Sequence, residues 1–149
     1  MNTTPLDTLI ELAERRCDEA ARLVAREISA HRSVEQKTKV LEQYRAEYVT
    51  RQPTAANSGT DTTTLRNFSG FLDKLDDAVA QAVRETSDCM ARLSRAQAAW
   101  NDAKRTLEGY EALMRRNADR AALRERRVEQ RQQDEFAARS ARLHGGLSR

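Results

Sequence analysis

Aromatic residues, glycine and proline are scarce in this chain of 149 residues: 5% are aromatic, five are glycine and two are proline. Because glycine and proline interrupt helices, their scarcity allows long helices. Because aromatic side chains are few, the chain cannot fill a large hydrophobic core. Charged residues make up 33% of the chain, which suits helices that are exposed to solvent. The length allows one domain, over residues 1–149. Long exposed helices enclose no pocket, so the composition argues against an enzyme.

Cysteine and metal-binding patterns are equally sparse. Cys17 and Cys89 are the only cysteines, and no CxxC or Cys/His spacing accompanies them. Both fall on apolar helical positions, which is typical of small core residues in a reducing compartment. The sequence also lacks the GxxxxGK[ST], GxSxG and HExxH motifs of phosphate-binding loops, hydrolases and metalloproteases. We therefore expect no catalytic residues, no metal and no cofactor.

No stretch of the chain approaches the roughly 18 apolar residues of a membrane span. The N-terminus has no basic segment followed by an apolar run, so it does not resemble a signal peptide. We expect a cytoplasmic protein that does not insert directly into a membrane.

The charge of the chain is uneven along its length. Residues 111–149 hold ten basic and six acidic residues, so they carry a net charge of +4, whereas residues 1–60 hold nine of each sign. The arginines of the C-terminal part alternate with acidic residues, and no set of aromatic residues accompanies them. A nucleic-acid-binding helix needs a denser basic face, so we expect no nucleic acid partner. A protein surface of acidic or mixed charge fits better.

A first helix is predicted over residues 5–51. Thr4 can cap it, Pro5 suits the first helical position, and Asp7 lies in the first turn, where acidic residues are favourable. Core positions then recur in a seven-residue pattern, nine of the thirteen being apolar. They are Leu6, Ile10, Ala13, Cys17, Ala20, Val24, Glu27, His31, Val34, Thr38, Leu41, Arg45 and Tyr48.

The middle of this pattern is polar, at Glu27, His31 and Thr38. We interpret His31 as a polar core residue that sets the register of the helix pair.

A second helix is predicted over residues 65–143, after a loop at 52–64 that contains Pro53, Asn57, Ser58 and Gly59. Residues 144–149 are expected to form a tail. The seven-residue pattern is strongest in this helix, where fifteen of eighteen core positions between 68 and 128 are apolar. Such a sustained repeat predicts a left-handed coiled coil.

Two such helices joined by one loop predict an all-α protein: an antiparallel coiled-coil hairpin in which each apolar seam covers the other. The second helix is longer, so residues from about 115 to 143 form a C-terminal overhang without an intramolecular partner. A lone helix of that length is marginally stable in water, and a binding partner is expected to order it.

Aromatic residues flank the loop on both sides. Tyr48 and Phe68 fit the seam, and core packing is their simplest role. Tyr44 and Phe71 each fall one position before a core site. Their spacing fits either aromatic cover for the seam or an exposed docking patch.

Several segments together resemble the family of the flagellar export protein FliJ. They are LDTLIELAERRCDEAARLV and VLEQYRAEY before the loop, and FSGFLDKLDDAV, AAWNDAKRTLEGYEAL and RRVEQRQQDEFAARSA after it. The most specific features are Tyr-x3-Tyr, Phe-x2-Phe, the lone Trp and DEFA, in that order. The resemblance covers residues 6 to 142.

The resemblance implies a stalk-like coiled coil of the flagellar type III export apparatus, cytoplasmic and peripheral at the inner face of the inner membrane. It implies binding to a hexameric export ATPase, whose assembly and activity the protein promotes, and to the cytoplasmic domain of the export gate membrane protein. It further implies an escort role with the chaperones of filament-type substrates.

The resemblance also implies two sets of binding residues. The gate-binding residues are Leu41, Tyr44, Tyr48, Phe71, Leu75 and Ala78. The residues that face the ATPase ring are Arg126, Arg127, Val128, Asp134, Glu135 and Phe136. Lys37 and Ala82 depart from the family pattern, which has Gln and His there.

Two alternatives remain open. A stalk protein of a virulence-type III secretion system would share the fold and the ATPase partner. A structural homodimer would instead use the same seam between two chains.

Overall fold

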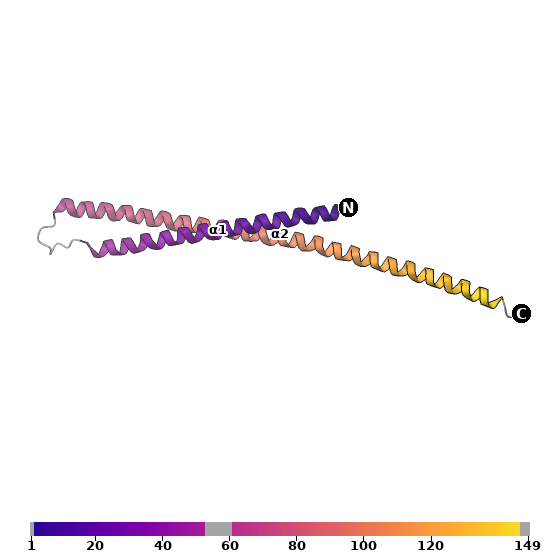
Figure 1. Ribbon diagram of the computed structural model, residues 1–149. Helices are drawn as coiled ribbons and strands as arrows, with labels where there is room; N and C mark the ends of the chain where they lie inside the picture. Colours follow the sequence, from indigo (N-terminus) through magenta and orange to yellow (C-terminus); the bar gives the residue numbers. More distant parts are fainter. Residues whose placement is uncertain (1, 53–60, 147–149) are drawn as a thin grey trace. The chain divides into compact units, whose positions relative to one another are not determined.

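The computed structural model describes residues 2–52 and 61–146, and within them all regular structure is helical. Helix α1 spans Pro5–Thr50 and helix α2 spans Thr62–Gly145, with 46 and 84 residues (Figure 1). The all-α class and the longer second helix are confirmed. Helix α2 begins at Thr62, ahead of the expected residue 65. The predicted loop residues Pro53, Asn57, Ser58 and Gly59 lie outside the described residues.

The chain divides into two compact units, and both helices contribute to each. One unit is formed by Arg15–Lys104 and contains most of α1 with the first half of α2. The other combines Met1–Glu14 with Arg105–Arg149.

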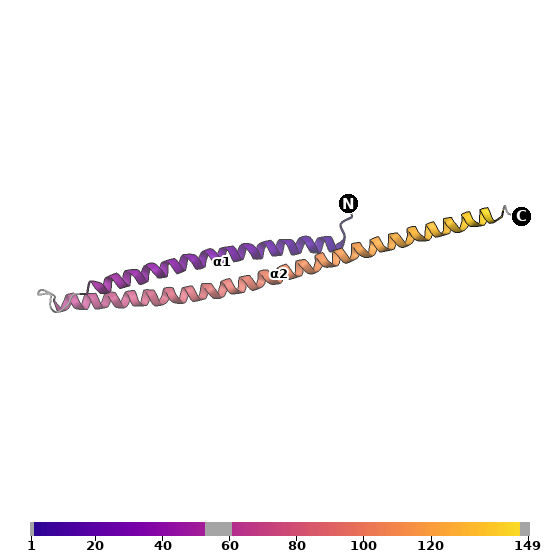
Figure 2. The same ribbon diagram turned by 90° about the horizontal axis from the view of Figure 1, so that it is seen from below.

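In the unit of residues 15–104, α1 and α2 lie side by side in opposite directions (Figures 1 and 2). Polar contacts between the helices define this arrangement. Glu27 pairs with Arg92 at 3.4 Å between Oε2 and Nε, and further along α1 Lys37 pairs with Glu85 at 3.5 Å between Nζ and Oε2. Nearer the loop, Arg45 pairs with Asp76. Along these three pairs the residue number on α2 falls as the residue number on α1 rises. The two helices therefore form an antiparallel hairpin.

Small residues lie deepest in the seam of this unit. Ala82, Cys89 and Ala96 are 1%, 3% and 4% exposed, and the larger Val24 and Leu75 are buried as well. Because a side chain of one to two heavy atoms occupies little room, the two backbones can approach closely while neighbouring large residues cover the gap. All thirteen predicted core positions of α1 are buried or half-buried. The seven-residue pattern therefore identified the buried face correctly.

Hydrogen bonds accommodate much of the polar middle of the seam. The hydroxyls of Thr38 and Thr86 lie 3.1 Å apart across the helix pair. Each hydroxyl also bonds to a carbonyl of its own helix, four residues back, at 2.9 Å. His31 Nδ1 lies 4.0 Å from a carboxylate oxygen of Glu35, and its Nε2 is buried without a hydrogen-bond partner in the part of the chain that the structure describes. A polar layer of this kind makes the seam less stable than an apolar seam would be. It also disfavours shifted registers of the two helices, because the polar groups would lose their hydrogen-bond partners in them.

The other unit contains the start of α1. Thr4 caps the helix: its backbone N–H and its hydroxyl donate to Asp7 Oδ2 at 2.9 and 2.6 Å. The Asp7 backbone N–H in turn donates to Thr4 Oγ1 at 3.3 Å. This reciprocal capping satisfies backbone donors that the first turn of a helix leaves free. Further along α1, the seam residue Ala13 is 4% exposed.

The same unit contains the end of α2. Every residue from Leu113 to Arg139 is exposed, although the segment is helical throughout. The predicted overhang is thus present, and its first residue lies close to the expected position 115. Across residues 2–52 and 61–146, neither helix combines the length and the apolar character that a membrane crossing requires.

The close approach at Ala82 leads to a stability prediction. Ala82→Leu should lower the free energy of unfolding by about 1–3 kcal/mol, because the added carbons must push the helices apart. Ala80 is exposed on the same helix. Ala80→Leu is the matched control and should change the free energy by less than about 0.5 kcal/mol. Urea denaturation followed by circular dichroism measures both, and equal effects would contradict the tight seam.

The capping contact leads to a pH prediction. The Thr4 hydroxyl, followed by the Thr4 backbone N–H, holds the pKa of Asp7 below its ordinary value of 3.8. Because the folded-state pKa is lowered, this stabilisation is present above 3.8 and is lost as the pH falls through the lower folded-state pKa. Backbone amide chemical shifts of residues 6–8 should report this fraying of the first turn. In Thr4→Ala the hydroxyl is lost and the backbone N–H is kept, so the pKa of Asp7 should return toward 3.8; an unchanged pKa would exclude the Thr4 hydroxyl as the main cause.

Candidate binding surfaces

Four rings from both helices form an aromatic cluster in the unit of residues 15–104: Tyr44 and Tyr48 from α1, Phe68 and Phe71 from α2. Tyr48 stacks on Phe68 with ring centroids 4.5 Å apart and an interplanar angle of 7°. Tyr48 also contacts Phe71 at 4.8 Å. The rings thus join the two helices close to the ends that face the loop.

Two rings of the cluster remain accessible. Tyr44 is 46% exposed and Phe71 is 40% exposed, whereas Tyr48 and Phe68 are half-buried. Tyr44 and Phe71 meet edge to face at 6.5 Å, with an interplanar angle of 88°. Both contact Tyr48, as aromatic cover for the seam requires, and both still present apolar surface to solvent.

The other residues of the predicted gate-binding set differ in accessibility. Leu41 on α1 and Ala78 on α2 are half-buried, whereas Leu75 is 7% exposed. Leu75 therefore offers almost no surface to a second protein, and its contribution is to hold the helices that carry the rings.

Two ion pairs border this region, and sequence reasoning did not identify them. Lys37 pairs with Glu85, and Arg45 pairs with Asp76. Lys37 and Glu85 each lie one position before a core site, and such flanking charges face each other in an antiparallel coiled coil. The spacing could have revealed the first pair. Ala82, the other position that departs from the family pattern, is 1% exposed.

The predicted ATPase-facing residues all lie on the overhang, defined here as residues 115–142. Val128 is 52% exposed and Phe136 is 74% exposed. Arg126, Arg127, Asp134 and Glu135 are exposed as well, and none of them forms an ion pair with another described residue. The set is therefore distributed along a single helix, and no second element brings its members together.

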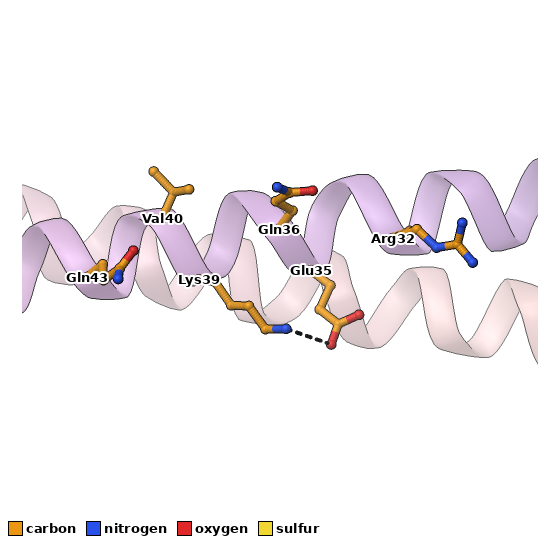
Figure 3. A pocket seen from close by; sticks show the side chains of 6 residues that line it. All are labelled: Arg32, Glu35, Gln36, Lys39, Val40 and Gln43. Carbon is orange, nitrogen blue, oxygen red and sulfur yellow. Dashed lines mark ion pairs between the residues drawn. The ribbon is translucent and has the colours of Figure 1, made fainter.

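Hollows on the surface are open grooves. The one drawn in Figure 3 has a volume of about 450 Å³, and all six of its lining residues come from α1. Its one ion pair joins Lys39 Nζ to Glu35 Oε1 at 3.6 Å (Figure 3). Within the described residues no three His, Cys, Asp or Glu side chains come together as metal ligands. This groove does not resemble a catalytic cleft.

These features define an all-α coiled-coil protein with two exposed surfaces: an aromatic cluster on the helix pair and a helical overhang. Comparison with known proteins agrees with this class. The family described as Flagellar FliJ protein matches residues 1–146.

Two curated relatives are also called Flagellar FliJ protein. The one from Salmonella typhi is 30% identical over 136 residues, covering 91% of this chain and 92% of the relative. The one from Escherichia coli (strain K12) is 29% identical over the same length and coverage. The chain belongs to the FliJ family of flagellar proteins, and the resemblance predicted from its motifs is confirmed. Membership supports a place in flagellar protein export, and the family is not one of enzymes.

Proposed function

We propose that this chain is a non-catalytic link in the flagellar export apparatus. Its overhang binds the hexameric export ATPase and promotes ring assembly and activity, and its aromatic cluster binds the cytoplasmic domain of the export gate. In this role the protein works at the cytoplasmic face of the inner membrane and helps to escort the chaperones of filament-type substrates. Both relatives carry a flagellar name, which favours this role over the virulence-type alternative.

The observation that carries the ATPase assignment is the complete exposure of α2 from Leu113 to Arg139. The segment retains apolar residues such as Val128 and Phe136, which are costly to leave in water. A single helix in water has only its own backbone hydrogen bonds and is marginally stable. A binding partner would stabilise the helix and cover these side chains.

The charge of the overhang fits a ring-lining partner of acidic or mixed charge. Arg126 and Arg127 directly precede Val128 and therefore lie on other faces of the helix, so a ring that surrounds the overhang would meet basic and apolar groups at the same level. Asp134 and Glu135 precede Phe136 in the same way. Charged groups at the edge of an apolar contact accelerate association and select the partner.

The gate assignment is supported by the two exposed rings. Large aromatic side chains that are already held in place lose little entropy on binding, which is why they dominate the energy of many interfaces. Tyr44 and Phe71 are held by each other and by Tyr48. The cluster therefore has the chemistry of a preformed apolar docking site.

Truncation after Met114 tests the ATPase assignment. The truncated chain should retain a folded helix pair and should fail to stimulate ATP hydrolysis by the export ATPase. Added salt should weaken the intact complex, because part of the attraction is between charges. A full-length Tyr44→Ala, Phe71→Ala variant is the control and should stimulate normally. Stimulation by the truncated chain at the level of the full chain would contradict the assignment.

The same double variant tests the gate assignment. Removal of both exposed rings should weaken binding to the cytoplasmic domain of the gate by about 1–3 kcal/mol, as expected for aromatic residues at the centre of an interface. Motility should fall, while helicity and ATPase stimulation should be retained. Isothermal titration calorimetry measures the binding. If gate binding and ATPase stimulation fall together with helicity, the rings serve the core of the protein and not the gate.

A further inference from the structure

A second groove lies on the side of the helix pair away from Tyr44. It is lined by Glu35, Glu42, Val83 and Met90 among others, and has a volume of about 360 Å³. Tyr44 lies one position before a core site of α1, and Glu42 one position after one, so they flank the seam on opposite sides. The groove is therefore separate from the aromatic cluster, and the proposed function makes no use of it.

The α2 wall of this groove is uncharged over a long distance. Met90 is 60% exposed and Val83 is 49% exposed. They belong to a row of exposed positions, three or four residues apart, that holds no charge in a chain with 33% charged residues. The row consists of Ala80, Val83, Ser87, Met90, Ser94, Gln97 and Asn101. At 1.5 Å per residue it extends about 30 Å, the length of a helix of roughly 20 residues.

The α1 wall of the groove is acidic. Glu35 and Lys39 largely neutralise each other, since Nζ and Oε1 lie 3.6 Å apart (Figure 3). Glu42 is exposed and forms no ion pair with any residue in the described ranges. The groove thus combines a neutral, partly apolar floor with an unneutralised carboxylate on its edge, and it suits a helix that carries an apolar row beside basic residues.

The overhang of the same protein has this chemistry. Residues 115–142 contain nine basic and five acidic residues, a net charge of +4. Arg124 and Arg131 precede and follow Val128 by about one helical turn, so they share its face. Both are exposed, and among the described residues neither forms an ion pair.

We propose that the overhang of one copy docks in the groove of a second copy. Val128 and Ala121, which lies seven residues before it on the same face, cover Val83 and Met90, and Arg124 and Arg131 approach Glu42. Such a contact joins two different surfaces, so each chain offers one site of each kind. The protein therefore self-associates through surfaces that its internal seam leaves free. A partner that takes the overhang would compete with this association.

Sedimentation equilibrium of the full chain over a range of concentrations tests the proposal. The average mass should rise above that of the monomer with concentration. Glu42→Arg should raise the apparent dissociation constant at least about tenfold, because like charges then face each other. Arg124→Glu with Arg131→Glu should do the same. Asp88→Arg is the matched control: Asp88 is exposed on α2, does not line the groove, and its reversal should leave the association unchanged.

Mixing the two charge-reversal variants gives the sharper result. The Glu42→Arg chain retains an intact overhang, and the Arg124→Glu, Arg131→Glu chain retains an intact groove. Each variant alone should be largely monomeric. The mixture should associate again, because the intact overhang of one variant meets the intact groove of the other, and the two altered surfaces again carry opposite charges.

Three outcomes would overturn the proposal. They are a full chain that stays monomeric at all concentrations, an association that Glu42→Arg leaves unchanged, and a mixture that stays monomeric while each variant folds normally by circular dichroism. A homodimer in which the seam pairs between two chains would give the second of these outcomes, an association that Glu42→Arg leaves unchanged. None of these measurements uses the ATPase or the gate, so the result is independent of the proposed function.

Discussion

The close approach of two helices across a row of small side chains is the constraint on which the remaining structure depends. Two helices enclose no volume, so only the residues directly between them are removed from water. Ala82, Cys89, Ala96 and Ala13 are the most deeply buried of the described residues, because only short side chains fit where the backbones are closest. Larger neighbours such as Leu72 and Trp100 are half-buried and cover the edges of the seam. Stability therefore comes from a long, thin contact.

A contact of this kind leaves much apolar surface accessible, and the position of that surface determines what the protein can bind. Near the loop, Tyr44 and Phe71 are held at the edge of the seam by contacts with Tyr48. Further along the helix pair, Val83 and Met90 line a groove on the other side. Beyond Leu113 the seam of α2 continues without a covering helix. In each case apolar surface remains that the chain does not cover itself.

The polar middle of the seam has a different consequence. Thr38 and Thr86 bond to each other and to their own helices, and Glu27 and Arg92 pair across the helices. A shift of one helix by a heptad would separate these partners without a matching gain in apolar contact. The polar layer thus opposes alternative registers, at the expense of stability that an apolar seam would have supplied. His31, whose buried Nε2 has no partner among the described residues, contributes to that loss.

The sequence alone determined the helices, their buried faces, the cap at Thr4 and the family. These depend on local chemistry and on a seven-residue repeat, both of which are written along the chain. It also predicted the overhang, since helix lengths follow from where the breakers lie. What only the tertiary structure decided is which flanking residues meet across the seam. The Lys37–Glu85 pair, the exposure of Tyr44 and Phe71, the burial of Leu75 and the groove beside Glu42 depend on the axial alignment of two helices. A shift of a few residues would change every one of these contacts and leave the heptad pattern intact.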